Sequence, residues 1–281
     1  MEALDGGVSH GNHALEIREA DGTSWNVVLR RWVRPDWRDT EPDFSPEQEI
    51  ATYALLGNSE VAAPRLLAAD PEGRECDVPA LLLTRLPGRR VVDPPDRAGF
   101  VARLAEALPA IHSIDPEAAR SAIRPYSRFV DETSLVLPAW VERRDLWERA
   151  IGVVEGVPPT GRLTFIHRDY HPGNILWLEG RISGIVDWTS ASFGPPGVDL
   201  SHMRANLAML FDLETADAFL EGHRAVAEGR GGAGSDYHPY WDLRVAVDFL
   251  EDLTDLPELT ASGQAILRIE RFVERAISDL S

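Results

Sequence analysis

The chain has 281 residues, of which 44% are hydrophobic, and this size is comfortable for a core divided between two lobes. Its net charge of −18 disfavours nucleic-acid binding through a broad basic surface. An acidic protein would instead attract cationic ligands, although the charge also serves solubility. The single cysteine, Cys76, excludes an intramolecular disulfide and a zinc site built from cysteines.

No stretch of the sequence approaches the roughly 20 consecutive apolar residues that a membrane-spanning helix needs. Residues 1–7 lack the basic start and the apolar centre of a secretory signal. We therefore expect a soluble, cytoplasmic protein without a membrane partner, present as a monomer or a homodimer.

The N-terminal part of the chain predicts a small sheet. Residues 14–18 and 25–33 bracket an Asp-Gly turn signal and predict a β-hairpin. A further apolar run, 80–86, predicts another strand, which ends at a Pro-Gly break. From residue 96 onward the apolar spacing is mostly helical.

A helix is predicted to begin after Ser45. Serine is a favourable N-cap, Pro46 suits the first helical position, and Gln48 is placed to complete a capping box. The helical pattern continues to Leu56, and Gly57 ends it.

The segment 163–174 carries the clearest chemical signal. An apolar run leads into His167-Arg168-Asp169, and Asn174 follows at the spacing H-R-D-x-x-x-x-N. In the catalytic loop of kinases with this spacing, the Asp accepts the proton of the attacking hydroxyl and the Asn holds a magnesium ion.

The residues after this loop support the same interpretation. Runs 175–178 and 182–186 predict a hairpin that returns Asp187 to the neighbourhood of Asn174. Two oxygen ligands on rigid supports suit Mg²⁺, which keeps waters and phosphate oxygens as its other ligands. Asp and Asn are common in turns for local reasons, so the prediction depends on all three polar residues at once.

The sequences H-R-D-Y-H-P-G-N-I-L-W and I-V-D-W resemble the aminoglycoside phosphotransferase and choline kinase-like superfamily of small-molecule kinases. That family usually has H-G-D in the loop, so Arg168 is a departure that leaves the reacting groups unchanged. The resemblance implies an α+β, bilobal protein-kinase-like fold. Residues 1–86 would form a small nucleotide-binding lobe with an antiparallel sheet and one αC-type helix, and residues 87–281 a larger, mainly helical lobe for catalysis and acceptor binding.

The resemblance also implies roles for individual residues. Asp169 would be the catalytic base, and Asn174 and Asp187 would hold Mg²⁺ with ATP or GTP as the donor. Arg30 stands where kinases carry a strand lysine, and it would contact the phosphates.

The partner of Arg30 would be an acid of the helix after Ser45. Glu49 matches the family pattern E-x-x-x-L-x-x-L, and Glu47 is the alternative, because the helix dipole alone also explains an acid in the first turn.

Three further positions follow from the resemblance. Ser9 lies in a glycine-containing loop that would cover the phosphates, although a flexible N-terminal turn fits this loop equally. The backbone around Arg85 and Leu86 would hydrogen-bond the adenine. Asp199 would cap the helix that follows it and brace the catalytic loop.

The acceptor implied by the resemblance is a hydroxyl of a small molecule. Acidic residues of the helix near 241–256 would receive amino groups, which favours an aminoglycoside or another cationic antibiotic; these residues are Asp242, Asp248, Glu251, Asp252 and Asp255. A metabolic kinase for an amino alcohol, sugar or amino-acid derivative would use the same core. A non-catalytic nucleotide-binding module is a third reading, and the intact catalytic residues argue against it.

Overall fold

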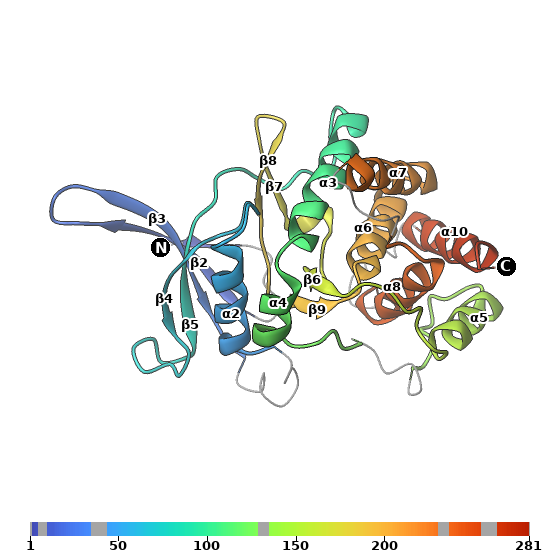
Figure 1. The fold of residues 1–281 in the computed structure, drawn as a ribbon, viewed down its shortest axis with the longest axis horizontal. Helices are drawn as coiled ribbons and strands as arrows, with labels where there is room; N and C mark the ends of the chain where they lie inside the picture. Colours follow the sequence, from blue (N-terminus) through green and yellow to red (C-terminus); the bar gives the residue numbers. More distant parts are fainter. Residues whose placement is uncertain are drawn as a thin grey trace.

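The structure, a computed structural model, describes residues 2–4, 10–34, 44–128, 135–229, 236–253 and 263–280. A sheet and one helix lie on one side of the molecule, and a group of helices lies on the other (Figure 1). The short strands that carry the catalytic segment lie between them.

The N-terminal sheet has five antiparallel strands in the order β1-β2-β3-β5-β4. Their bounds are β1 Glu2–Ala3, β2 Gly11–Arg18, β3 Ser24–Arg31, β4 Leu66–Asp70 and β5 Ala80–Thr84. The predicted hairpin is confirmed, with Arg18 opposite Ser24 across the turn. Gly22 has a φ of 89°, a left-handed conformation that glycine adopts without steric cost.

Helix α2, Pro46–Leu56, begins as predicted, because the Ser45 side chain accepts a hydrogen bond from the Gln48 amide. The second half of the predicted capping box is wrong. The Gln48 side chain donates to the carbonyl of Ala191 and accepts from the amide of Arg124. Tertiary partners from the helical side of the molecule therefore replace the local one.

The remaining elements form the larger part of the molecule. They are α3 Arg97–His112, α4 Pro116–Ala122, α5 Arg144–Val154, β6 Thr164–Ile166, the 3₁₀ turn η1 Pro172–Asn174, β7 Ile175–Leu178, β8 Arg181–Ile185, β9 Ser192–Gly194, α6 Gly197–Leu210, α7 Leu213–Gly229, α8 Pro239–Asp252 and α10 Gln264–Ser278. Helix α6 is buried over most of its length and packs against α7, α8 and α10. It is therefore the central helix of this part.

The second predicted hairpin is also confirmed. β7 and β8 pair antiparallel, with Ile175 opposite Ile185. The amide of Val186 then donates to the carbonyl of Asn174 at 2.9 Å. This bond brings Asp187 back beside the end of the catalytic loop.

The α+β arrangement therefore agrees with the prediction of a small antiparallel sheet with one helix and a larger helical part. The connection from β5 to α3 bridges the two, because residue Arg89 exchanges two backbone hydrogen bonds with Trp177 of β7. A division near residue 86 stays a prediction. Among the described residues, no helix is long and apolar enough to cross a membrane.

Leu108 of α3 is fully buried, whereas Leu267 of α10 is half exposed. We expect Leu108→Ala to lower the free energy of unfolding by about 2–5 kcal/mol, because the truncation leaves a cavity in the core. Leu267→Ala, the control, should change it by less than about 0.5 kcal/mol. Urea denaturation of the two variants measures the difference, and equal losses would contradict this packing.

Candidate active site

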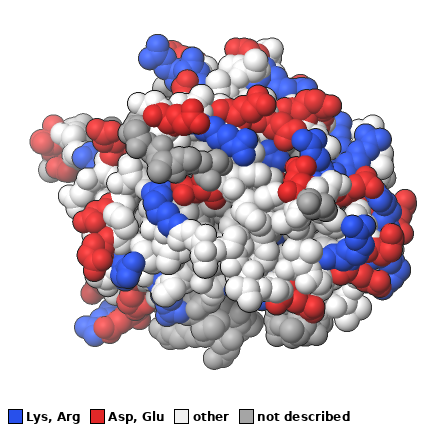
Figure 2. Space-filling model, turned by 45° about the vertical axis from the view of Figure 1, so that its right-hand side comes forward, with Lys and Arg blue, Asp and Glu red and all other residues white. Residues whose placement is uncertain are grey.

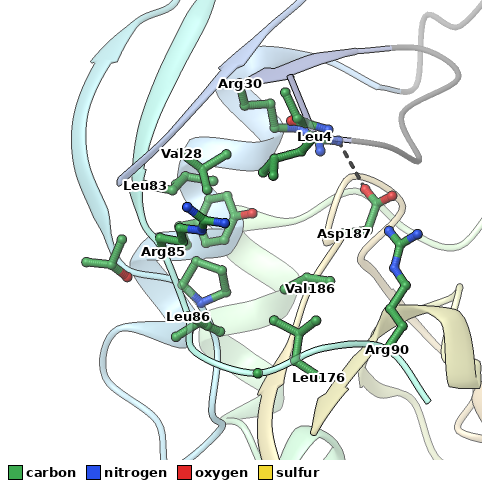
Figure 3. Close-up of a pocket in the computed structure, with 15 residues that line it drawn as sticks. Leu4, Val28, Arg30, Leu83, Arg85, Leu86, Arg90, Leu176, Val186 and Asp187 are labelled. Atoms are coloured by element: carbon green, nitrogen blue, oxygen red, sulfur yellow. Dashed lines mark hydrogen bonds and ion pairs between the residues drawn. The ribbon is translucent and has the colours of Figure 1, made fainter. Parts of the chain in front are cut away.

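A pocket of about 250 Å³ lies between the N-terminal sheet and the β7–β8 hairpin. Val28 and Leu83 of the sheet face Leu176 and Val186 of the hairpin region across it (Figure 3). The lining residues are Leu4, Asn12, Val28, Arg30, Tyr53, Pro64, Leu83, Thr84, Arg85, Leu86, Gly88, Arg90, Leu176, Val186 and Asp187. An apolar slot with a few charged groups at one end is typical of a site for a planar ring with a polar tail.

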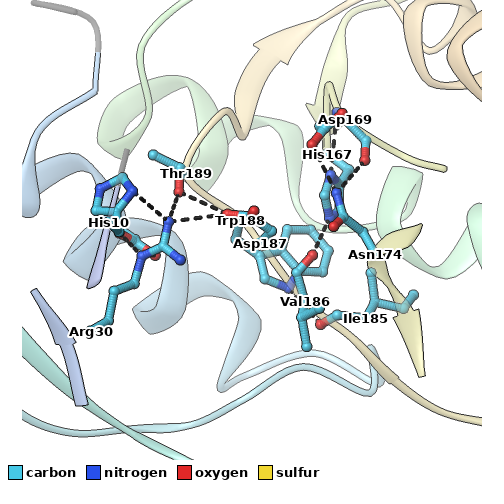
Figure 4. A network of polar contacts seen from close by, with 11 residues as sticks. His10, Arg30, His167, Asp169, Asn174, Ile185, Val186, Asp187, Trp188 and Thr189 are labelled. Carbon is cyan, nitrogen blue, oxygen red and sulfur yellow. Dashed lines mark hydrogen bonds and ion pairs between the residues drawn. The ribbon is translucent and has the colours of Figure 1, made fainter. Parts of the chain in front are cut away.

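Arg30 is the buried cation at the polar end of this pocket. It lies on β3 and is only 6% exposed, and its Nε lies 3.0 Å from the Glu49 carboxylate of α2. Its Nη2 donates to Asp187 Oδ1 at 3.1 Å and also to the hydroxyl of Thr189 (Figure 4). One guanidinium therefore joins the sheet, α2 and the segment after β8.

Arg30 stays protonated and positively charged in this environment. Burial disfavours the cation, but the carboxylates of Glu49 and Asp187 outweigh it and raise the pKa of Arg30 above its ordinary value. His10 lies at 3.2 Å from the Arg30 Nη2 through its Nδ1. Burial and the charge of Arg30 lower the pKa of His10 to about 3, so the ring is neutral and can accept this hydrogen bond.

Of the two acids proposed as the Arg30 partner, Glu49 is the one that the structure selects. It is 1% exposed and lies on the buried face of α2. Glu47 is exposed in the first turn of the same helix. Two residues along a helix point about 200° apart, so only one of these side chains can reach the sheet.

Asp169 lies in the loop after β6, and both of its carboxylate oxygens are held. Asn174 Nδ2 donates to Oδ2 at 2.8 Å and to the Asp169 carbonyl at 3.0 Å. His202 Nε2 of α6 lies 3.1 Å from Oδ1, and His171 Nε2 lies 3.7 Å from it. Burial would raise the pKa of Asp169, but these imidazoles and His167 hold it well below its ordinary value. The carboxylate is ionised and one third exposed.

His167 links this loop to the residue before Asp187. Its Nε2 lies 3.0 Å from the Val186 carbonyl, and its Nδ1 accepts from the Asp169 amide. Because the amide fixes Nδ1 as an acceptor, Nε2 carries the proton and donates. The predicted catalytic base, Asp169, and the predicted metal ligand Asp187 are therefore connected through the imidazole of His167.

Asp199 holds the backbone of the loop from inside α6. Its carboxylate accepts from the amides of His167 and Arg168 at 2.9 and 2.6 Å and lies 2.9 Å from His112 Nε2. The bracing role predicted for it agrees with this geometry. The predicted capping role is wrong, because Pro196 occupies the N-cap and no side chain caps the helix.

Two residues of the site have left-handed backbone conformations. Arg168 has a φ of 69° and Asp187 a φ of 63°. Non-glycine residues rarely adopt this region, and it costs about 1–3 kcal/mol where the surroundings enforce it. Glycine at the position of Arg168, which is usual in the resembled family, would adopt this φ freely.

The predicted magnesium ligands fit a hard cation. Asn174 uses its amide nitrogen on Asp169, which leaves its Oδ1 for a ligand. Asp187 Oδ1 takes bonds from Arg30 and Thr189, and the residue lines the pocket. Among the described residues, no cluster of three or more His, Cys, Asp or Glu forms a complete metal cage. The two predicted ligands offer oxygen atoms, which is the ligand type that a hard cation such as Mg²⁺ prefers.

Arg85 and Leu86 line the opposite end of the pocket, where the adenine was predicted. The Arg85 amide already donates to the carbonyl of Asn26. In the part of the chain that the structure describes, the Leu86 amide has no hydrogen-bond partner, so it is the better donor to a base. Ser9 lies outside the described residues.

The sequence model of the phosphotransferase enzyme family (APH) matches residues 7–238. The chain belongs to this family. No curated protein matches this phosphotransferase.

Solved structures of related enzymes cover nearly the whole of this phosphotransferase. An aminoglycoside phosphotransferase, APH(4)-Ia, in a ternary complex with ADP and hygromycin B has a TM-score of 0.64 at 16% identity, covering 98% of this chain and 92% of that one. A putative aminoglycoside phosphotransferase from Ralstonia eutropha has a TM-score of 0.64 at 15% identity, with coverages of 99% and 92%. The macrolide 2′-phosphotransferase MphH from Brachybacterium faecium has a TM-score of 0.56 at 18% identity, and the match covers 95% of this chain and 91% of that one. At these identities the similarity establishes the bilobal kinase-like fold.

Four polar residues of this phosphotransferase's site were not singled out from the sequence, namely His10, His171, Thr189 and His202. His171 and Thr189 each lie two residues from a predicted site residue, so proximity along the chain was a usable signal. His10 directly follows the predicted Ser9, so the same signal was available for it, whereas His202 comes from α6 and no local pattern marks it.

The acidic residues of α8 are less available than the sequence suggested. Asp242 is 1% exposed and pairs with Arg204 at 3.2 Å. Asp248 is paired with Arg244 one turn earlier, at 2.6 Å. Asp255 lies outside the described residues, as do the side chains of Glu251 and Asp252. The two acids that the structure describes on α8 are therefore neutralised by arginine.

We expect Glu49→Ala to lower the free energy of unfolding of this phosphotransferase by about 3–5 kcal/mol, because it removes the fully buried one of the two carboxylates that pair with Arg30. Glu47→Ala removes the same charge from an exposed position of the same helix and should cost less than about 0.5 kcal/mol. Guanidinium denaturation measures both. Similar losses in the two variants would refute the assignment of Glu49.

Proposed function

We propose that the protein transfers the γ-phosphoryl group of ATP or GTP to a hydroxyl of a small molecule. The observation that carries this proposal is that Asp187 and Arg30 line one pocket, and that the loop of Asp169 and Asn174 is hydrogen-bonded to Val186, the residue before Asp187. Membership of the phosphotransferase family supports it, as does the related structure with bound ADP.

In this mechanism the protein mainly positions the two substrates and stabilises the charge of the phosphates. The nucleobase of ATP or GTP would lie between the apolar side chains of Val28 and Val186, and the backbone amide of Leu86 would donate a hydrogen bond to it. Asn174 and Asp187 would hold Mg²⁺, which neutralises phosphate charge when it is bound. Arg30 Nη1, without a hydrogen-bond partner among the described residues, would donate to the phosphates, while Glu49 holds the guanidinium in place.

Asp169 would receive the acceptor's proton. Its depressed pKa keeps it ionised, and the bond from Asn174 keeps the carboxylate beside the predicted metal ligands. A base of low pKa takes the proton late in the transfer, when the oxygen already bonds to phosphorus. Orientation of the hydroxyl is therefore the larger contribution of this residue.

For the acceptor, we propose an aminoglycoside or another cationic antibiotic. The net charge of −18 supports it, as does the similarity to aminoglycoside and macrolide phosphotransferases. On the face seen in Figure 2, however, acidic and basic residues are interspersed around the margin and do not form one acidic surface.

A metabolic acceptor is the second candidate, and the α8 ion pairs favour it. Arg204 and Arg244 already neutralise Asp242 and Asp248, so these acids offer little to a polycation. An amino alcohol, a sugar or an amino-acid derivative needs fewer carboxylates than a polyamine does.

A mass-spectrometric screen tests the proposal and separates the two acceptor classes. The protein is incubated with Mg²⁺, ATP and GTP, and pools of aminoglycosides, other antibiotics and hydroxylated metabolites. A pool member that gains one phosphoryl group identifies the acceptor class. Nucleotide binding without any modified acceptor would instead support a binding module, and absence of nucleotide binding would overturn the proposal.

We expect Asp169→Asn and Asp187→Asn each to lower kcat with that acceptor by about 10³-fold or more, since one loses the base and the other a metal ligand. Asp145→Asn, on the exposed first turn of α5, is the matched control and should retain full turnover. Steady-state kinetics measures all three, and normal kcat in Asp187→Asn would exclude its role in phosphoryl transfer.

A further inference from the structure

His202 approaches the carboxylate of Asp169 from the central helix α6. Its Nε2 lies 3.1 Å from Asp169 Oδ1, which is a hydrogen-bond distance. His171, from the loop itself, lies 3.7 Å from the same oxygen and is too far for a bond. His202 is therefore the imidazole that is engaged.

The second oxygen of Asp169 is already occupied by Asn174 at 2.8 Å. A carboxylate held at one oxygen can still swing about its side-chain bonds. A bond to each oxygen from two different elements removes this freedom and fixes the direction of the remaining lone pairs. Asp169 remains one third exposed, so a hydroxyl can reach it.

The ring of His202 is fixed by its surroundings. It is 9% exposed, and its ring lies edge-on to Phe249 of α8, with the centroids 5.1 Å apart. His202 follows Asp199 by three residues in α6, so the two side chains share one face of the helix. Asp199 holds the loop backbone, and His202 contacts the functional group of the same loop.

We propose that His202 is a positioning residue for phosphoryl transfer, whose Nε2–H donates to Asp169 Oδ1 and keeps the carboxylate directed at the acceptor hydroxyl. This rests on the proposed function, in which Asp169 receives the hydroxyl proton. The acceptor oxygen bonds to the γ-phosphorus, the bond from phosphorus to the bridging oxygen breaks, and that oxygen leaves with the nucleoside diphosphate. His202 exchanges no atom in this step.

Two substitutions separate hydrogen bonding from packing. His202→Phe keeps an aromatic ring but has no donor, and we expect kcat to fall by about 10- to 100-fold, as for a misdirected catalytic group. The KM for the nucleotide should not change. His202→Gln restores an N–H donor. Its log kcat should lie at least halfway from the value of His202→Phe to that of the wild type.

Ser201→Ala is the matched control. Ser201 is the preceding residue of α6 and is fully buried, but it is not among the residues around Asp169. It should leave kcat unchanged, and melting temperatures of all variants exclude unfolding as the cause. Wild-type kcat in His202→Phe, or equal losses in the Phe and Gln variants, would overturn the proposal.

An NMR measurement keeps this test independent of the acceptor. The imidazole ¹⁵N–¹H signals of His202, assigned by their loss in His202→Gln, are compared between the wild type and Asp169→Asn. Donation to the carboxylate predicts a downfield Nε2 proton that moves in Asp169→Asn, whereas the signals of His223, which lies on α7 and stacks on Phe219, stay in place. An Nε2 signal that does not move refutes the positioning role, whereas a moving signal in a protein that phosphorylates no acceptor means that the proposed function has failed.

Discussion

The arrangement of the site depends on the contacts of one buried carboxylate, that of Asp199. It is completely shielded from water and accepts from two consecutive amides of the catalytic loop while it contacts His112 of α3. A buried charge is tolerated only when hydrogen bonds replace its hydration, and these three partners do so. The central helix, α3 and the loop are thereby held in one arrangement, and the direction of Asp169 follows from it.

A second group of charges, centred on the buried Arg30, fixes the sheet relative to this loop. Arg30 binds Glu49 from α2 and Asp187 from the hairpin side, and Gln48 of the same helix reaches Ala191. The chain contains no lysine, so a guanidinium takes the position at which kinases usually carry an ammonium group. Its planar fork can serve several acceptors at once, which a lysine on the same strand would do less well. Buried ion pairs add little net stability, but they specify geometry.

The sequence was sufficient where the interactions are local and insufficient where they are not. The H-R-D-x-x-x-x-N loop and its hairpin span a short segment, so spacing and turn chemistry predicted them. The family pattern E-x-x-x-L-x-x-L, which is also local, favoured Glu49 over Glu47 as the partner of Arg30, and the structure agrees. Gln48 looked like a capping residue because its tertiary partners at Ala191 and Arg124 are far along the chain. Likewise, the charge of Asp242 appeared available, because no sequence pattern showed that Arg204 of α6 would neutralise it. For Asp248 a local signal existed, since Arg244 precedes it by four residues on the same helix.

The residue at position 168 affects the stability of this loop through the unfolded chain as well as through the folded structure. Its left-handed backbone costs about 1–2 kcal/mol relative to glycine in the folded state. A glycine, however, has more conformational freedom to lose on folding, by about 0.4–1 kcal/mol. Because these two terms oppose each other with similar sizes, the side chain decides the balance, through its 2.6 Å bond to the Ser127 carbonyl and its position over the Tyr126 ring. An arginine in place of glycine therefore adds backbone strain to the folded state, but it lowers the entropy of the unfolded chain and adds a hydrogen bond that holds the loop.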